Sequence, residues 1–233
     1  YNMYHHFTVD EHTIFAIGIL NAIENGELKD EVPIASEVVH KVVSRRVLYL
    51  ALLFHDIAKG RPGDHSEVGA RIVRKQCPRL GLSEAETETV AWLVQYHLSM
   101  SDTAFKRDVN DPKTSEIFAE LVQSPERLRL LVVMTVADIR AVGPHVWNAW
   151  KAALLRELYW RTEERLSGGI EAAEVTARAN RVKAQLSERL EDWTNKDRDA
   201  HLRRGSTRYW VSADLETLAR QAKLVRAAEK SKE

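Results

Sequence analysis

The chain contains little of what builds sheets, disulfides or membrane spans. Its 233 residues include 10 glycines and 6 prolines, and the alternation of apolar and polar residues that marks a strand is hard to find. The single cysteine, Cys77, excludes a disulfide within the chain and suits a reducing compartment. The longest apolar run, Val47–Phe54, is too short to cross a bilayer. With no recognisable signal peptide, we expect a cytoplasmic protein that does not contact a membrane.

The chain also lacks an excess of charge of either sign. Lys and Arg together number 34, as do Asp and Glu, so no global basic field exists to attract a nucleic acid. Hydrophobic residues make up 44% of the chain, which is enough for a packed core and excludes a disordered protein. Because the chain starts at Tyr1 close to a helical pattern, we expect it to be a piece of a longer protein.

What the sequence does show is helical periodicity, which predicts an all-α fold. Helices are expected over residues 10–24, 36–59, 65–76, 84–98, 125–142 and from there to 166. Three starts carry capping signals: Asp64 with Glu67, Ser83 with Glu86, and Ser124 before a proline. Residues 99–114 are polar and are expected to be irregular. Residues 170–204 are expected to form a charged helical arm, and 220–233 a linker or frayed tail.

Several of these helices place a histidine or aspartate on an apolar face. A buried carboxylate is costly unless it is paired or binds a metal, so these residues need partners. Helices that converge on one core can supply such partners to each other through a cation. A mixed set of imidazoles and carboxylates suits a first-row divalent metal such as Mn, Fe or Zn better than Ca or Mg. The candidate ligands are His12, His55, Asp56, His65, His97 and Asp138.

Taken singly, each candidate also has a structural explanation. His12 or His97 would most often be a hydrogen-bonded core histidine. Asp138 could cap a helix or pair with Arg140, and His65 could simply be a residue at a helix start. These structural explanations are less favoured for the whole set than for any one residue, because a separate explanation would have to hold on each of several helices.

The order of four candidates resembles the HD superfamily of metal-dependent phosphohydrolases, and two more match its two-metal branch. The four are His12, His55, Asp56 and Asp138, and the two are His65 and His97. Longer phrases resemble the HD domain of the bifunctional PII uridylyltransferase/uridylyl-removing enzymes over roughly residues 4–151. These phrases are "HHFTVDEHT", "FHDIAKGRPGDHSEVGA", "YHLSMSDTAFKRDVNDP" and "TVADIRAVGPHVWNAWK". Pro62 departs from the family pattern, which has glycine in that loop.

The resemblance implies an HD helical bundle over residues 1–166, with a helical extension and linker over 167–233. The extension would lead toward a regulatory ACT region outside this sequence, since "RYWV" at 208–211 resembles the stretch ahead of that region. The implied reaction is hydrolysis of UMP from a uridylylated tyrosine of the PII signal protein. The sequence has no nucleotidyltransferase motif, so we expect no UMP transfer from it. The implied partners are uridylylated PII and the product UMP.

The resemblance also implies roles for individual residues. His12, His55, Asp56 and Asp138 would hold one metal ion; His65 and His97 would hold a second, with Asp56 bridging the two ions. Lys59, one turn after His55, is expected to act in catalysis by steadying a phosphoryl oxygen or the attacking hydroxide. The competing interpretation, about equally favoured, is an ion pair of Lys59 with Asp56 or Asp64.

Weaker candidates for substrate contact lie outside the ligand set. His5 precedes the first helix and could reach the site, and Arg107 and Asp108 follow His97 in the polar segment. Solvated surface positions are the competing interpretation for all three. The tryptophans at 147, 150 and 160 are expected to form a stripe that buries the late long helix.

Two other functions compete with removal of UMP. An HD hydrolase of a free nucleotide would use the same ligands on a deoxynucleoside triphosphate, guanosine tetraphosphate or a cyclic dinucleotide. A non-catalytic helical docking module would hold its metal for structural reasons only. The complete ligand set together with Lys59 argues against the docking module.

Overall fold

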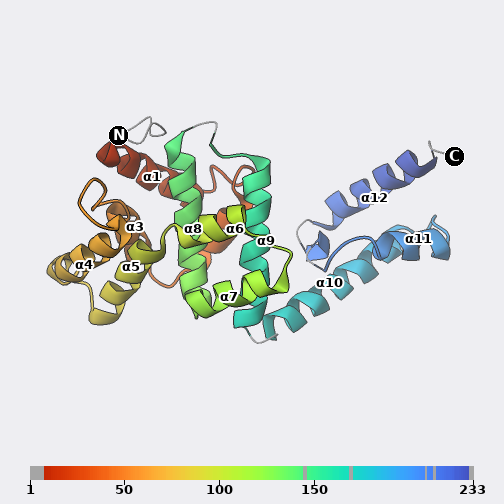
Figure 1. Ribbon diagram of the computed structural model, residues 1–233. Coiled ribbons are helices and arrows are strands. Elements are labelled where there is room, and N and C mark those ends of the chain that lie inside the picture. Colours follow the sequence, from red (N-terminus) through yellow and green to blue (C-terminus); the bar gives the residue numbers. More distant parts are fainter. Residues whose placement is uncertain (1–7, 144–145, 168–169, 208, 212–213, 231–233) are drawn as a thin grey trace. The chain divides into compact units, whose positions relative to one another are not determined.

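The computed structural model describes residues 8–143, 146–167, 170–207, 209–211 and 214–230, and these residues form helices and no strand (Figure 1). The expected all-α fold is thereby confirmed. The chain divides into two compact units after Leu166. The functional roles expected for the two parts stay predictions. None of the described helices combines the length and apolar composition that crossing a bilayer requires.

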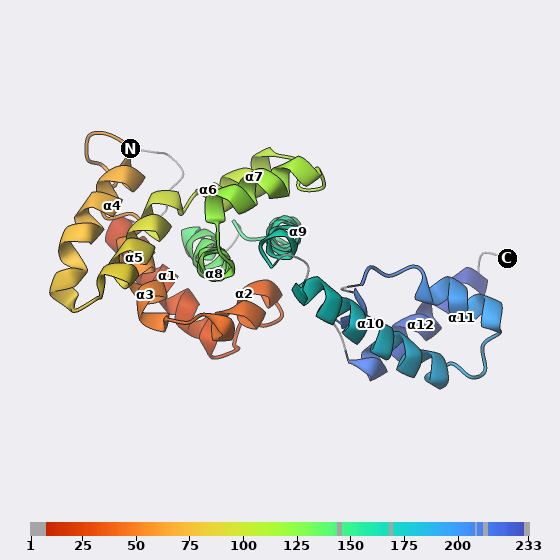
Figure 2. The same cartoon turned by 90° about the horizontal axis from the view of Figure 1, so that it is seen from below.

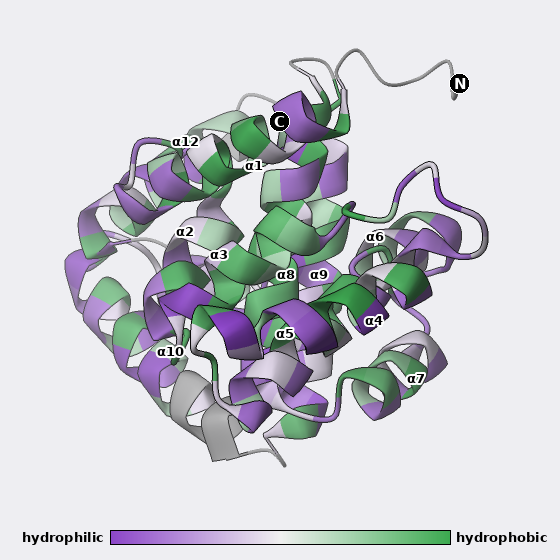
Figure 3. Ribbon diagram, turned by 90° about the vertical axis from the view of Figure 1, so that its left-hand side faces the viewer, coloured by the Kyte–Doolittle hydropathy of each residue, from purple (hydrophilic) through white to green (hydrophobic). Residues whose placement is uncertain are grey.

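The first unit is built around one helix, α8 (Pro125–Val142), which is buried on nearly all sides. In Figure 3 this helix is largely apolar, as a helix without a solvent face should be. It packs against seven other α-helices of the unit. The helices around α8 are α1 (Val9–Glu24), α2 (Pro33–Val38), α3 (Arg45–Phe54), α5 (Glu84–Tyr96), α6 (Ser99–Lys106), α7 (Pro112–Val122) and α9 (Ala149–Leu166). Helix α4 (His65–Gln76) packs on α5, and 3-10 turns occupy Val39–Lys41 and Pro78–Leu80.

The capping signals place helix starts correctly. Ser83 and Glu86 form the expected reciprocal capping box at α5, and the hydroxyl of Ser124 accepts from the amide of Arg127 at α8. Asp64 caps α4, since its carboxylate accepts from the amides of the second and third helical residues. The return bond expected from Glu67 is not among the contacts of the described residues.

The single helix expected over residues 36–59 is wrong. The chain leaves the helical conformation after α2 and its 3-10 turn, and Ser44 has extended dihedrals of φ −128° and ψ 102°. The hydroxyl of Ser44 then caps a new helix by accepting from the amide of Val47 at 3.3 Å. This helix, α3, ends at Phe54, so His55 and Asp56 follow its last turn instead of lying within a continuous helix.

The polar segment 99–114 is also helical in large part, which corrects a second expectation. Helix α6 begins directly after α5, and buries Met100 and Ala104 against the core. Helix α7 begins with Asp111 as its cap and Pro112 at its first position, a pair of start signals that the polar composition of the segment obscured.

The second unit has a small core of its own. It consists of α10 (Ile170–Arg189), α11 (Asn195–Leu202), a 3-10 turn at Tyr209–Val211 and α12 (Leu215–Lys230), seen from below in Figure 2. Its buried residues are Ala179, Leu186, Leu190, Trp193, Trp210, Leu218 and Ala222. Because Leu218 and Ala222 belong to this core, the frayed tail expected over 220–233 is wrong as far as Lys230, where α12 ends.

Candidate metal centre

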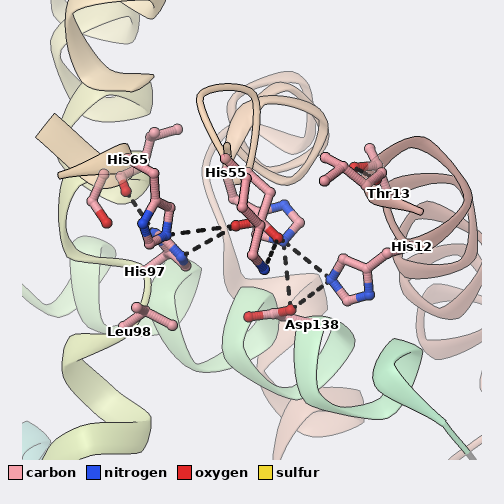
Figure 4. A network of polar contacts seen from close by, with 12 residues as sticks. His12, Thr13, His55, His65, His97, Leu98 and Asp138 are labelled. Carbon is pink, nitrogen blue, oxygen red and sulfur yellow. Dashed lines mark hydrogen bonds and ion pairs between the residues drawn. The ribbon is translucent and has the colours of Figure 1, made fainter. Parts of the chain in front are cut away.

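Five segments of the first unit bring the six candidate ligands together (Figure 4). Helix α1 supplies one, the turn after α3 two, the first residue of α4 one, the residue after α5 one, and the last part of α8 one. Four of the six residues are at most 5% exposed, whereas the side chains of His65 and Asp138 are 27% and 17% exposed. The centre is therefore largely buried, and His65 and Asp138 are its partly exposed members.

One half of the centre is formed by His12, His55 and Asp138, whose candidate ligand atoms all lie within 4.8 Å of one another. Nε2 of His12 lies 2.9 Å from Oδ1 of Asp138 and 3.3 Å from Nε2 of His55. Nε2 of His55 lies 3.5 Å from the same carboxylate oxygen. Two imidazole nitrogens and one carboxylate oxygen thus converge on one point, in a donor set that suits Mn, Fe or Zn.

The other half is formed by Asp56, His65 and His97, again within 4.8 Å. Oδ1 of Asp56 lies 3.7 Å from Nε2 of His65 and 3.9 Å from Nε2 of His97. The rings of the two histidines are 5.3 Å apart between centroids. These separations are too long for hydrogen bonds but leave room for an ion between the three groups.

Asp56 connects the two halves. Its Oδ1 faces His65 and His97, whereas its Oδ2 lies 3.5 Å from Nε2 of His55 and accepts a hydrogen bond from Nζ of Lys59 at 2.8 Å. Asp56 therefore presents one carboxylate oxygen to each of the two groups of candidate ligands, which is the arrangement of a residue that bridges two metal sites.

Two backbone carbonyls orient the most buried histidines. Nδ1 of His55 lies 2.7 Å from the carbonyl oxygen of Leu52, and Nδ1 of His97 lies 2.7 Å from that of Val94. A carbonyl only accepts hydrogen bonds, so each Nδ1 must carry the proton. In the neutral ring Nε2 is then unprotonated, and its lone pair points toward the centre, where it can bind a metal ion. These rings therefore fit a metal ion.

These carbonyl contacts were missed from the sequence, although a signal for them exists. Each histidine is the residue that directly follows a helix, three positions after its carbonyl partner. The last carbonyls of a helix have no partner within the helix, so a histidine at this position can bond one of them.

Charges within the centre act on one another. Burial lowers the pKa of His55, but the hydrogen bond and charge of Asp138, together with Asp56, outweigh burial and raise it above 6.5. Burial and the neighbouring His55 lower the pKa of His97. Burial raises the pKa of Asp138, yet His12 and His55 bond its carboxylate and bring the net pKa below its usual range. Burial likewise opposes ionisation of Asp56, but His55 and Lys59 hold its pKa low.

We therefore expect metal loading to depend on pH. A metal ion and a proton compete for Nε2 of His55, and the raised pKa makes the proton a stronger competitor than on an ordinary histidine. The apparent Kd for Mn²⁺ should rise by about tenfold per pH unit for each proton displaced, as pH falls through the raised pKa of His55. Calorimetric titration between about pH 8.5 and about pH 6.0 measures this. A Kd that does not change over this range would contradict it.

The structure also decides between some alternatives and leaves others as predictions. Arg140 pairs with Glu31, and the described contacts include none between Arg140 and Asp138. The pair of Lys59 with Asp56 exists, which leaves the catalytic role of Lys59 a prediction. Arg107 and Asp108 are exposed, and neither contacts the six candidate ligands among the described contacts. His5 lies outside the described residues.

Comparisons with known proteins found a matching family model and matching relatives. The family model described as HD domain matches residues 9–141. A relative from Azospirillum brasilense, named bifunctional uridylyltransferase/uridylyl-removing enzyme, is 62% identical over 226 residues, which is 97% of this chain and 24% of the relative. Relatives of the same name from Rhodospirillum rubrum and Nitrobacter winogradskyi are 52% and 49% identical over 98% and 99% of the chain, and 24% and 25% of their own lengths. The chain thus spans about a quarter of the curated relatives it matches.

Proposed function

Because the chain belongs to the HD domain family, we propose that it is a metal-dependent phosphodiesterase that removes UMP from a uridylylated tyrosine of the PII signal protein. The hydrolytic part of this proposal rests mainly on one observation, the position of Asp56 between the two donor sets. The choice of substrate is supported by the names of the three relatives and by their identity to nearly all of this chain.

We propose that two divalent ions, Mn, Fe or Zn, occupy the centre. His12, His55, Asp56 and Asp138 would hold one ion, and Asp56, His65 and His97 the other. When bound, such ions supply Lewis acidity, which lowers the pKa of bound water to about 7 and neutralises charge on a phosphoryl group. The carbonyls of Leu52 and Val94 keep two of the histidine ligands in the required tautomer.

Lys59 is placed to act on the substrate. Its ammonium lies 2.8 Å from the bridging carboxylate and its side chain is 32% exposed, so it reaches both the centre and the solvent side. An ammonium does not bind a cation, so its action is on a phosphoryl oxygen or on the attacking hydroxide. The departing tyrosine phenolate has a pKa of about 10, so it needs less help from a general acid than an alkoxide would.

A hydrolase of free nucleotides is the second candidate function, because it would use the same six ligands. The identity to relatives named uridylyl-removing enzymes favours the first candidate. A docking module with a purely structural metal is disfavoured by the partial exposure of Lys59 and His65, which leaves part of the centre accessible to a substrate.

The proposal makes a prediction for the isolated chain. With Mn²⁺ it should hydrolyse a chromogenic phosphodiester such as bis(p-nitrophenyl) phosphate, and removing the metal with a chelator should stop the reaction. Incubation with UTP and unmodified PII should yield no uridylylated PII, because no nucleotidyltransferase motif occurs in the sequence. The measurements are release of p-nitrophenolate and the mass of PII. Labelling of PII by this chain, or hydrolysis that survives complete metal removal, would contradict the proposal.

A further inference from the structure

Gly69 is a buried residue of α4 and lies one turn after the candidate ligand His65. A glycine inside a helix destabilises that helix relative to alanine, because the glycine backbone loses more freedom on folding. The backbone conformation gives no reason for a glycine here, since Gly69 is not among the described glycines with positive φ. The structure therefore points to the space beside Gly69 as the reason.

The space beside Gly69 is filled by a side chain of α5. A Cβ atom added to Gly69 would lie 2.9 Å from Cγ1 of Val94, which is fully buried. Two carbon atoms in contact rest about 3.5–4.0 Å apart, so relief of this contact requires a displacement of about 0.6–1.1 Å. Val94 gives little relief by rotating, because a β-branched side chain in a helix has one strongly preferred rotamer. The substitution Gly69→Ala would therefore push α4 and α5 apart.

Gly69 also borders the three segments that supply the second half of the centre, which consists of Asp56, His65 and His97. After Val94, the atoms nearest to the added Cβ would be Cγ2 of Ile57 at 3.7 Å and the carbonyl oxygen of Phe54 at 3.9 Å. Phe54 and Ile57 flank the turn that carries Asp56. Val94 precedes His97 by three residues, and its carbonyl orients the imidazole of that histidine. All three ligand-bearing segments thus meet at the side of Gly69.

The position of His65 depends on how closely α4 approaches α5. Helix α4 packs more extensively on α5 than on any other described element, and the two helices lie side by side in Figures 1 and 2. Residues four apart lie on the same side of a helix, so the side of α4 that contacts α5 at Gly69 also carries His65. Functional side chains must be held to within about 0.5 Å of their working geometry, which is less than the displacement that Gly69→Ala requires.

We propose that Gly69 is a positioning residue for the second half of the centre, an inference that rests on the proposed function. The absence of a side chain at Gly69 sets the separation of α4 and α5 at which the rings of His65 and His97 lie 5.3 Å apart between centroids. At this separation Nε2 of His65 lies 3.7 Å from Oδ1 of Asp56. Gly69 touches neither metal nor substrate in this account and acts through His65.

Calorimetric titration with Mn²⁺ tests the positioning role. Gly69→Ala should raise the Kd of the ion in the second half about 10- to 100-fold, the usual effect of losing the support behind metal ligands. The Kd of the other ion should change little. His65→Ala identifies which binding event belongs to the second half. Gly18→Ala is the matched control and should leave both Kd values unchanged, because Gly18 also lies in a ligand-bearing helix and no atom lies within 4 Å of its added Cβ.

A rescue experiment separates positioning from a general loss of stability. Loss of stability alone predicts a lower Tm for Gly69→Ala, with both Kd values unchanged. Val94→Ala removes the Cγ1 atom that the added Cβ would meet, so Gly69→Ala combined with Val94→Ala should bind the second ion as Val94→Ala alone does. The double variant carries the test even where Gly69→Ala alone does not fold. Its failure to bind an ion that Val94→Ala alone binds would overturn the positioning role.

A crystal structure of the metal-free Gly69→Ala protein separates failure of this inference from failure of the proposed function. The rings of His65 and His97 should lie farther apart than in the unsubstituted protein, by about 0.5 Å or more. An unchanged ring separation, or unchanged Kd values for both ions, would overturn the positioning role whether or not the chain hydrolyses a phosphodiester. Absence of Mn²⁺ binding by the unsubstituted chain would count against the proposed function, and the ring separation would still test Gly69.

Discussion

Replacing Asp56 by alanine should reduce phosphodiester hydrolysis to background and lower the metal content of the protein. Asp56 is the only one of the six proposed ligands that faces both donor sets, with Oδ2 toward His55 and Oδ1 toward His65 and His97. Its loss removes a shared ligand and the negative charge that shields two cations from each other. Metal analysis of the purified variant, with turnover on bis(p-nitrophenyl) phosphate, measures both effects.

A matched aspartate elsewhere controls for general damage to the fold. Asp111 caps α7 by accepting from the amide of Lys113, so Asp111→Ala should lower stability by about 1 kcal/mol through the lost cap. We expect this variant to retain its metal and its turnover per folded molecule. An Asp56→Ala protein with the original metal stoichiometry and activity would refute the bridging role.

Replacing Lys59 by alanine should lower turnover on the order of 10²–10³-fold while the metal stays bound. This is the typical effect of removing one preorganised charge that stabilises a transition state. Lys59 is not a proposed ligand, so its loss should lower the rate without lowering the metal content of the protein. Turnover per metal-loaded molecule, metal stoichiometry and melting temperature are to be measured on the same preparation.

The competing interpretation of Lys59 makes a different prediction. If it serves only in the ion pair with Asp56, its removal should lower the melting temperature, because Asp56 is buried and loses a partner, and turnover per metal-loaded molecule should barely change. Lys41→Ala is the matched control, since Lys41, in the 3-10 turn after α2, forms an i,i+4 pair with Glu37 away from the centre. Near-original turnover in a metal-loaded Lys59→Ala protein would show that the catalytic role is wrong.

The periodicity of apolar residues was sufficient to predict the helical class and to place three of the candidate ligands on helix sides that face the core. His12, His97 and Asp138 each share a helix side with buried residues, and a helix that buries one side carries every residue of that side inward. The prediction that the candidate ligands lie close together depended partly on this rule. The structure places them in two groups of three, and the ligand atoms of each group lie within 4.8 Å of one another. Their role as metal ligands stays a prediction.

The failures have physical causes at particular residues. No strong breaker marks the end of α2, and just before the break the amide of Val43 donates to the carboxylate of Glu126 at 2.8 Å, a tertiary contact that periodicity does not record. Helix α6 is short and mostly polar, so only Met100 and Ala104 reveal its buried side. Trp150 shows the limit of composition, because its large apolar side chain predicts a buried position and the structure leaves it 61% exposed. Exposure depends on what packs over a residue, which periodicity does not record.

Incubation of the Mn²⁺-loaded chain with uridylylated PII tests the central proposal most directly. Free UMP should appear, and the mass of PII should return to that of the unmodified protein. Asp56→Ala should release no UMP under the same conditions. Uridylylated PII that remains intact, while the same preparation hydrolyses a free nucleotide, would contradict the proposal and establish the second candidate function instead.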